Sequence, residues 1–192
     1  MSKDDFNQKI VSVAAQVFNR FGYKKTTMDE IAAELGKGKS SIYYYFKSKE
    51  EIFKAVVEKE ANFLRAEVRK SFENVNDPKE QIKNYVLTRM KAYKKVINFN
   101  NAMKDDILLH MDFVKKIRSR FDLYEIELLK KILEDGVKSG EFAIEDPNMA
   151  SIGIATALKG LEVPILESTK DEDIEMRLDN LLHILFNGII KR

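Results

Sequence analysis

Apolar side chains recur at the spacing of an α-helix along most of the chain, and this periodicity restricts the fold more than any other feature of the sequence. Turn formers that would interrupt such helices are scarce, with 8 Gly and 3 Pro in 192 residues. The pattern therefore predicts an all-α protein. Its first apolar stripe lies between residues 4 and 21 and comprises Phe6, Ile10, Val13, Ala14, Val17, Phe18 and Phe21.

Composition places the chain among folded proteins, because 44% of its residues are hydrophobic and 33% are charged. The chain contains no cysteine, which excludes disulfides, thiolate zinc sites and cysteine nucleophiles. No apolar run approaches the ~20 residues that a membrane helix needs, and the N-terminal residues lack the apolar core of a signal peptide. We expect a cytoplasmic protein.

Two short helices joined by a glycine-containing turn are predicted after the first helix. Thr26 and Thr27 precede Asp29 and Glu30, so either threonine can form a capping box at the start of a helix. Gly36 is expected to end that helix, and the stretch KGKSSIYYYF supplies a second one. Two short helices connected in this way form a helix-turn-helix.

Longer helices follow in the rest of the chain. Ser48 and Glu51 have capping-box spacing and open a long helix, and the clearest break comes at the sequence ENVNDP. We therefore expect a helix-turn-helix domain over residues 1–48, a linker helix over 49–76 and a helical domain over 77–192. Further stripes predict one helix from Ile82 to Ile97 and others up to residue 190, about nine helices in all.

Charge is distributed unevenly although the formal net charge is only +2. Between Arg20 and Lys49 seven basic residues face three acidic ones. A solvated lysine face and a nucleic-acid surface both fit this local excess, and charge alone does not separate them.

The segment GYKKTTMDEIAAELGKGKSSIYYYFKSKEEIF resembles the DNA-binding signature of the tetracycline repressor (TetR) family over its whole length. The residues that carry the resemblance keep fixed offsets over about 30 positions. The segment departs from the family pattern at Lys37, where a small apolar residue is usual, and at Gly38, where serine usually caps the second helix. The matching residues are Gly22, Tyr23, Thr26, Thr27, Ile31, Ala32, Gly36, Tyr43, Tyr45, Phe46, Lys49 and Phe53.

A recognition helix presents its first turn to base edges while its other face packs on the preceding helices. Small hydroxyl side chains permit close approach in the first turn, and longer side chains reach bases and phosphates. Positions at helix starts favour a phosphate. The expected DNA contacts are Thr27, Lys37, Lys39, Ser40, Ser41, Tyr43, Tyr44, Tyr45 and Lys49.

The resemblance implies a homodimer that binds double-stranded, pseudo-palindromic operator DNA and is released by a small molecule. Met and aromatic residues between Pro78 and Ser168 favour an apolar or aromatic effector, although ordinary core packing is the simpler explanation of any one of them taken alone. The candidate pocket residues are Met90, Tyr93, Phe99, Met103, Met111, Phe113, Ile117, Phe121, Tyr124 and Leu158.

The last two long helices are the candidate dimer interface. Their small residues let helices approach closely and their large ones fill the gaps, which suits either a subunit interface or a buried monomer core. The resemblance favours the interface. The candidate residues are Ile152, Gly153, Ala157, Gly160, Leu161, Leu178, Leu181, Leu182, Leu185, Phe186 and Ile189.

No catalytic, metal or cofactor site is predicted. Asp106 and His110 have the spacing of one helix face, but no further ligand cluster accompanies them. Phosphate-cradling glycine loops and recognisable catalytic triads are absent from the sequence. The alternative to a ligand-released repressor is an activator or a scaffold that uses the same DNA-binding segment without a diffusible ligand.

Overall fold

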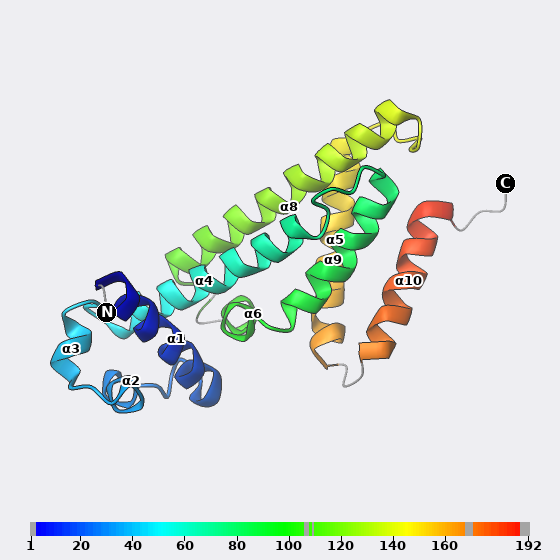
Figure 1. The fold of residues 1–192 in the computed structure, drawn as a ribbon. Helices are drawn as coiled ribbons and strands as arrows, with labels where there is room; N and C mark the ends of the chain where they lie inside the picture. Colours follow the sequence, from blue (N-terminus) through cyan, green and yellow to red (C-terminus); the bar gives the residue numbers. More distant parts are fainter. Residues whose placement is uncertain (1–2, 106–107, 109, 168–170, 189–192) are drawn as a thin grey trace. The chain divides into compact units, whose positions relative to one another are not determined.

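The computed structural model describes residues 3–105, 108, 110–167 and 171–188, without the side chains of 104, 163–167 and 171–174. These residues form nine helices and no strand, which confirms the predicted all-α class (Figure 1). In the described part of the chain, no helix is long and apolar enough to cross a membrane. The helices gather into two compact units, one of Met1–Phe63 with Val96–Ser119 and one of Leu64–Lys95 with Arg120–Arg192.

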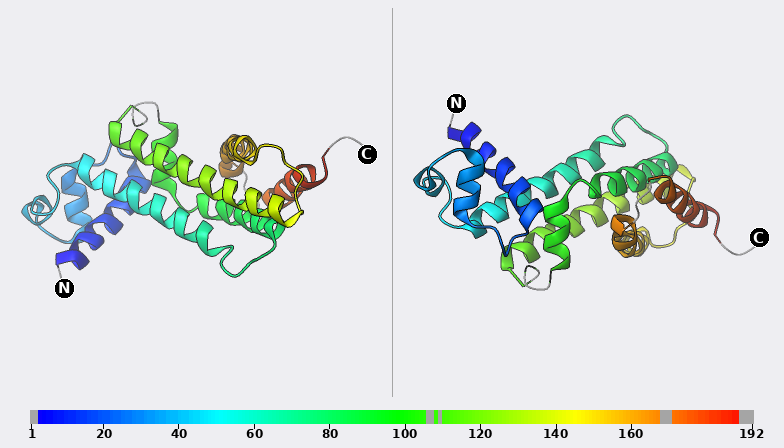
Figure 2. Two further views of the ribbon diagram at one scale, coloured as in Figure 1. Left: turned by 90° about the horizontal axis from the view of Figure 1, so that it is seen from above. Right: turned by 90° about the horizontal axis from the view of Figure 1, so that it is seen from below.

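The first unit begins with α1 (Lys3–Phe21), α2 (Met28–Leu35), α3 (Lys39–Tyr43) and the first half of α4 (Lys49–Lys70). Figures 1 and 2 show α2 and α3 as short helices beside α1. The core of this group contains Ile10, Phe18, Ile31, Ile42 and Phe53, all at most 1% exposed. Four residues of the stripe predicted for the first helix are thus buried, namely Ile10, Ala14, Val17 and Phe18, whereas Phe21 of the same stripe is 44% exposed.

The first unit also contains α6 (Ile97–Lys104) and the start of α8 (Asp112–Ser139). The single helix expected from Ile82 to Ile97 is wrong, since the structure has α5 (Pro78–Tyr93), a turn, and then α6. Neither Gly nor Pro marks this break. Val96, with φ −101° and ψ 65°, leaves the helical conformation, and the α6 amide of Phe99 is capped by the distant Glu60 carboxylate at 2.8 Å.

The second unit contains α5, the later part of α8, α9 (Pro147–Glu167) and α10 (Asp171–Asn187). Asp77 caps α5 by accepting a hydrogen bond from the Lys79 amide at 2.9 Å, and Pro78 occupies the first turn. Contacts of α5 with both α9 and α10 organise the unit (Figure 2). The boundary expected at residue 76 falls inside this unit, because the end of α4 belongs to it.

Candidate nucleic-acid interface

The turn between α2 and α3 is shaped by Gly36. This residue has φ 62° and ψ 36°, a left-handed conformation in which glycine carries no steric penalty. The Gly36 amide donates a hydrogen bond to a carbonyl in the last turn of α2, and the Lys37 amide donates to the Ala32 carbonyl at 3.0 Å. The chain thereby stops α2 and starts α3 within three residues, and the predicted helix-turn-helix is confirmed.

Thr27 and Glu30 form the capping box at the start of α2. The Glu30 amide donates to the Thr27 hydroxyl at 3.2 Å, and the Thr27 amide donates to the Glu30 carboxylate at 2.7 Å. Of the two threonines that the sequence allowed, Thr27 is thus the cap, and its hydroxyl also lies 3.0 Å from Glu30. The Thr27 side chain is exposed, so its DNA contact stays a prediction beside this structural role.

The recognition helix α3 has one buried and one open face. Ile42 is fully buried in the unit, whereas Tyr43 is 44% and Tyr44 is 71% exposed. Lys37, Lys39 and Ser40 are also exposed, and Ser41 is half-buried. Tyr45 is half-buried because its ring packs 5.2 Å from that of Phe6. The open face therefore offers ammonium and hydroxyl groups, the donors that bond to bases and phosphates.

Lys39 is held on that face by an acidic residue of α2. Its Nζ lies 2.9 Å from the Asp29 carboxylate and 5.9 Å from the centre of the Tyr43 ring. The hydrogen bond to Asp29 raises the pKa of Lys39 above its ordinary value. A phosphate that contacts Lys39 therefore competes with Asp29, a residue that the sequence reasoning did not include.

Lys49 is bonded inside the unit instead of lying free at the surface. Its ammonium donates to the carbonyls of Tyr23 at 2.7 Å and Thr26 at 2.8 Å, and lies 4.4 Å from the Tyr23 ring centre. Burial lowers the pKa of Lys49. At the position where the sequence predicted a phosphate contact, Lys49 ties the α1–α2 turn to α4.

Lys3 is a second residue that the sequence reasoning missed. Its Nζ lies 5.2 Å from the centre of the Tyr44 ring, beside the open face of α3. No spacing rule connects the start of α1 with α3, so only the fold brings these two side chains together.

The candidate pocket residues are divided between the two units. Phe99, Met103, Met111, Phe113 and Ile117 lie in the first unit, and Met90, Tyr93, Phe121, Tyr124 and Leu158 lie in the second. Most are buried, with Met103, Met111, Phe113 and Tyr124 half-buried. Neither the first-unit cavity of about 460 Å³ nor the second-unit cavity of about 660 Å³ is lined by any of them.

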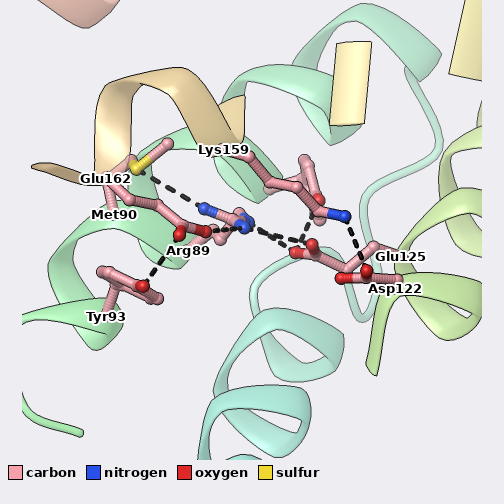
Figure 3. Close-up of polar contacts among 8 residues, drawn as sticks. Arg89, Met90, Tyr93, Asp122, Glu125, Lys159 and Glu162 are labelled. Carbon is pink, nitrogen blue, oxygen red and sulfur yellow. Dashed lines mark hydrogen bonds and ion pairs between the residues drawn. The ribbon is translucent and has the colours of Figure 1, made fainter. Parts of the chain in front are cut away.

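A buried ionic cluster occupies the second unit instead (Figure 3). The Arg89 guanidinium of α5 is fully buried and binds both oxygens of Glu125 in α8, with Nη2 3.1 Å from Oε2. The same Nη2 donates to Glu162 of α9 at 2.6 Å. Tyr85 donates to Glu125 at 2.9 Å and Tyr93 to Glu162 at 2.7 Å. The cluster thus links three helices through one cation and two carboxylates.

The protonation of this cluster follows from its surroundings. Burial acts to lower the pKa of Arg89, but the charge of Glu125 and its hydrogen bond outweigh burial and raise that pKa well above its ordinary value. Burial, together with the Glu125 charge, raises the pKa of Tyr85. Arg89 therefore stays charged and Tyr85 stays a donor at neutral pH.

The candidate dimer residues fall into three groups. Ile152, Gly153, Ala157, Gly160 and Leu185 are exposed; Leu161, Leu181 and Phe186 are half-buried. Leu178 and Leu182 are buried, so they pack inside the second unit. Ile189 lies outside the described residues.

Comparisons with known proteins give two family matches. The family described as "Bacterial regulatory proteins, tetR family" matches residues 10–56, and "QacR-like protein, C-terminal region" matches residues 82–191. The HTH-type transcriptional regulator QacR of Staphylococcus aureus is 24% identical over 204 residues, covering 97% of this chain and 100% of QacR.

Solved structures share the fold. A TetR/AcrR-family regulator from Thermobifida fusca has a TM-score of 0.79 at 24% identity, covering 97% of this chain and 100% of its own. AibR, solved with isovaleryl coenzyme A and operator DNA, has a TM-score of 0.71 at 18% identity and covers 95% and 99% of the two chains. The helix-turn-helix and both family matches thus agree that the chain belongs to the TetR family of DNA-binding transcriptional regulators, a family of regulators and not of enzymes.

Proposed function

We propose that the protein is a cytoplasmic TetR-type repressor that binds a palindromic operator as a homodimer and is released by a small apolar or aromatic molecule. The observation that carries this proposal is the open face of α3, where Lys39, Tyr43 and Tyr44 are exposed while Ile42 anchors the helix. A helix held in this way can enter the major groove without unfolding its own packing.

Exposed apolar side chains on α9 and α10 support the dimer. On α9 the exposed residues Met149, Ile152, Gly153, Ala157 and Gly160 recur at helical spacing along one face. Met176, Ile184 and Leu185 of α10 are between 41% and 59% exposed. Apolar surface of this kind on consecutive helices commonly marks a subunit interface. A two-fold dimer also supplies the two recognition helices that a palindrome requires.

The second unit has space for an effector. Its cavity of about 660 Å³ lies between α5, α9, α10 and the loop after α8, within the roughly 300–1,000 Å³ of small-molecule sites. Apolar side chains such as Ile82, Phe142 and Ile154 line it together with the charged Lys79 and Glu141. The apolar part of this lining supports an apolar or aromatic effector. Gly153 and Leu185 also line it, so the cavity borders the proposed dimer face. AibR, a protein of the same fold, was solved in complex with isovaleryl coenzyme A and operator DNA, which supports a small-molecule ligand for this chain.

Operator titrations at several salt concentrations test the DNA-binding role of α3. Replacing Lys39 with Gln removes one phosphate-reaching charge, so affinity should fall on all duplexes and the salt slope should decrease by about 1. The matched control is Lys131→Gln, an exposed lysine of α8 in the second unit. Identical slopes for Lys39→Gln, Lys131→Gln and the wild type would contradict the assigned role of Lys39.

A further inference from the structure

The first unit contains a cavity that the DNA-binding role does not use. It has a volume of about 460 Å³ and lies between the end of α1, the α1–α2 turn, α4 and α6. This volume falls within the roughly 300–1,000 Å³ typical of sites for small molecules. All residues that line it belong to the first unit, so its shape is set within that unit.

Packed aromatic rings form one wall of the cavity. The Phe53 ring lies 5.1 Å from that of Phe18 and 4.6 Å from that of Tyr23, measured between ring centres. Phe18 and Phe53 are each 1% exposed, so they hold the half-buried Tyr23 ring in place and present almost no surface of their own. The rings with surface at the cavity are Tyr23 and Phe21, which is 44% exposed. A preformed aromatic wall favours a flat aromatic ligand, which gains tilted or edge-to-face ring contacts at little cost in ordering.

Among the described residues that line the cavity, the charged ones are two lysines and one aspartate. Lys24 and Lys25 come from the α1–α2 turn, and Asp105 follows α6. Lys24 is paired with Asp105 at 3.2 Å. Lys25 is exposed and has no ion pair within the described part of the chain. The exposed side chain of Asn101 adds an amide at the same rim. The charge balance favours an anionic group on the ligand, and Lys25 is the cation available to pair with it.

Both sides of the cavity are attached to the DNA-binding helices. Asn98 of α6 donates to the Ala15 carbonyl of α1 at 3.1 Å and to Glu60 of α4 at 2.8 Å. On the other side, Lys49 holds the turn through the Tyr23 and Thr26 carbonyls, directly before α2. A molecule between α6 and the turn therefore touches the element that positions α2 and α3.

We propose that this cavity binds a small planar aromatic carboxylate, with its ring against Phe21 and Tyr23 and its carboxylate at Lys25. Such a ligand neutralises one lysine of the DNA-binding unit and therefore lowers operator affinity. The effect on the operator rests on the proposed function, whereas binding of the carboxylate does not.

The test uses 2-naphthoate, followed by its own fluorescence because the chain contains no tryptophan. The full chain without DNA should bind it saturably, and 2-naphthylmethylamine, which has the same ring system and the opposite charge, should bind more weakly. Lys25→Gln should reduce the affinity for naphthoate about two- to fivefold, the range of an exposed charge pair, and Lys25→Glu should reduce it further. Lys131→Gln and Lys131→Glu are the matched controls. Nuclear Overhauser contacts from naphthoate to the Phe21 and Tyr23 rings should locate the ligand.

Absence of saturable naphthoate binding, equal affinity for the amine, or equal effects of the Lys25 and Lys131 variants would overturn the assigned site. If naphthoate binds as described but leaves operator affinity unchanged, the proposed effect on DNA binding is wrong, whereas the proposed binding site stands. A protein that binds naphthoate but no operator at all would refute the proposed function, so the two failures are distinguishable.

Discussion

Replacing Arg89 with Met should strongly destabilise the second unit. The guanidinium is fully buried and bonds to Glu125 and Glu162, which come from two other helices. Methionine keeps most of the side-chain volume but leaves both carboxylates without their cation. The loss of stability therefore measures mainly the lost charge contacts, because little empty volume is created.

The magnitude follows from burial. Breaking a buried ion pair by removing one partner costs about 3–5 kcal/mol, because the remaining charge stays desolvated. The Glu125 side chain is 1% exposed and that of Glu162 is 19% exposed. Once Arg89 is removed, water can therefore solvate the carboxylate of Glu162 but hardly that of Glu125. We expect the free energy of unfolding to fall by about 3–4 kcal/mol, a large share of the roughly 5–15 kcal/mol of a typical domain.

Urea unfolding followed by circular dichroism at fixed protein concentration measures this loss. The double variant Arg89→Met/Glu125→Gln should recover part of it, because one uncompensated carboxylate is gone. A loss below about 1 kcal/mol for Arg89→Met, or a double variant that is less stable than the single one, would refute the reasoning.

Three further predictions concern other contacts. Lys49→Met should lower the free energy of unfolding by about 1–3 kcal/mol in urea titrations, because two carbonyls of the α1–α2 turn lose a charged donor; Lys47→Met, at a neighbouring exposed lysine, should change it little. Gly136→Ala should cost about 1–3 kcal/mol in the same assay, since a Cβ there would lie 2.1 Å from the Phe142 ring, and an unchanged stability would contradict this packing. Burial raises the pKa of Glu60 in the folded protein. The stability linked to that pKa is present at low pH and is lost as pH rises through the raised value. The free energy of unfolding should therefore fall as pH rises above the ordinary glutamate pKa of about 4.3, and Glu60→Gln should remove that fall.

Local signals were sufficient to predict the DNA-binding helices. The capping box of Thr27 and Glu30 and the left-handed Gly36 depend on residues at most four positions apart, and the structure contains both. The stripe of the first helix likewise identified the buried residues of α1 except Val11, although it also included the exposed Phe21. These features were predictable because each lies within one or two turns of helix.

Contacts between distant segments were not predictable in the same way. The start of α6 depends on Glu60, whose carboxylate caps an amide of a different helix. Arg89 is charged, so the sequence alone would place it at the surface and not in the core. Its partners Glu125 and Glu162 come from α8 and α9, far away in the sequence. Lys49 matched the family pattern, but its carbonyl partners in the α1–α2 turn are visible only in the folded unit.

In the proposed complex, two copies of the chain present two α3 helices to a two-fold operator. Selection of bound duplexes from a random pool, with the stoichiometry of the purified complex determined by sedimentation, tests it most directly. We expect an enriched palindrome whose half-sites lie about 10 base pairs apart, or a multiple of that, bound by an even number of chains. Enrichment of a single asymmetric site bound by one chain, or no enrichment at all, would contradict it.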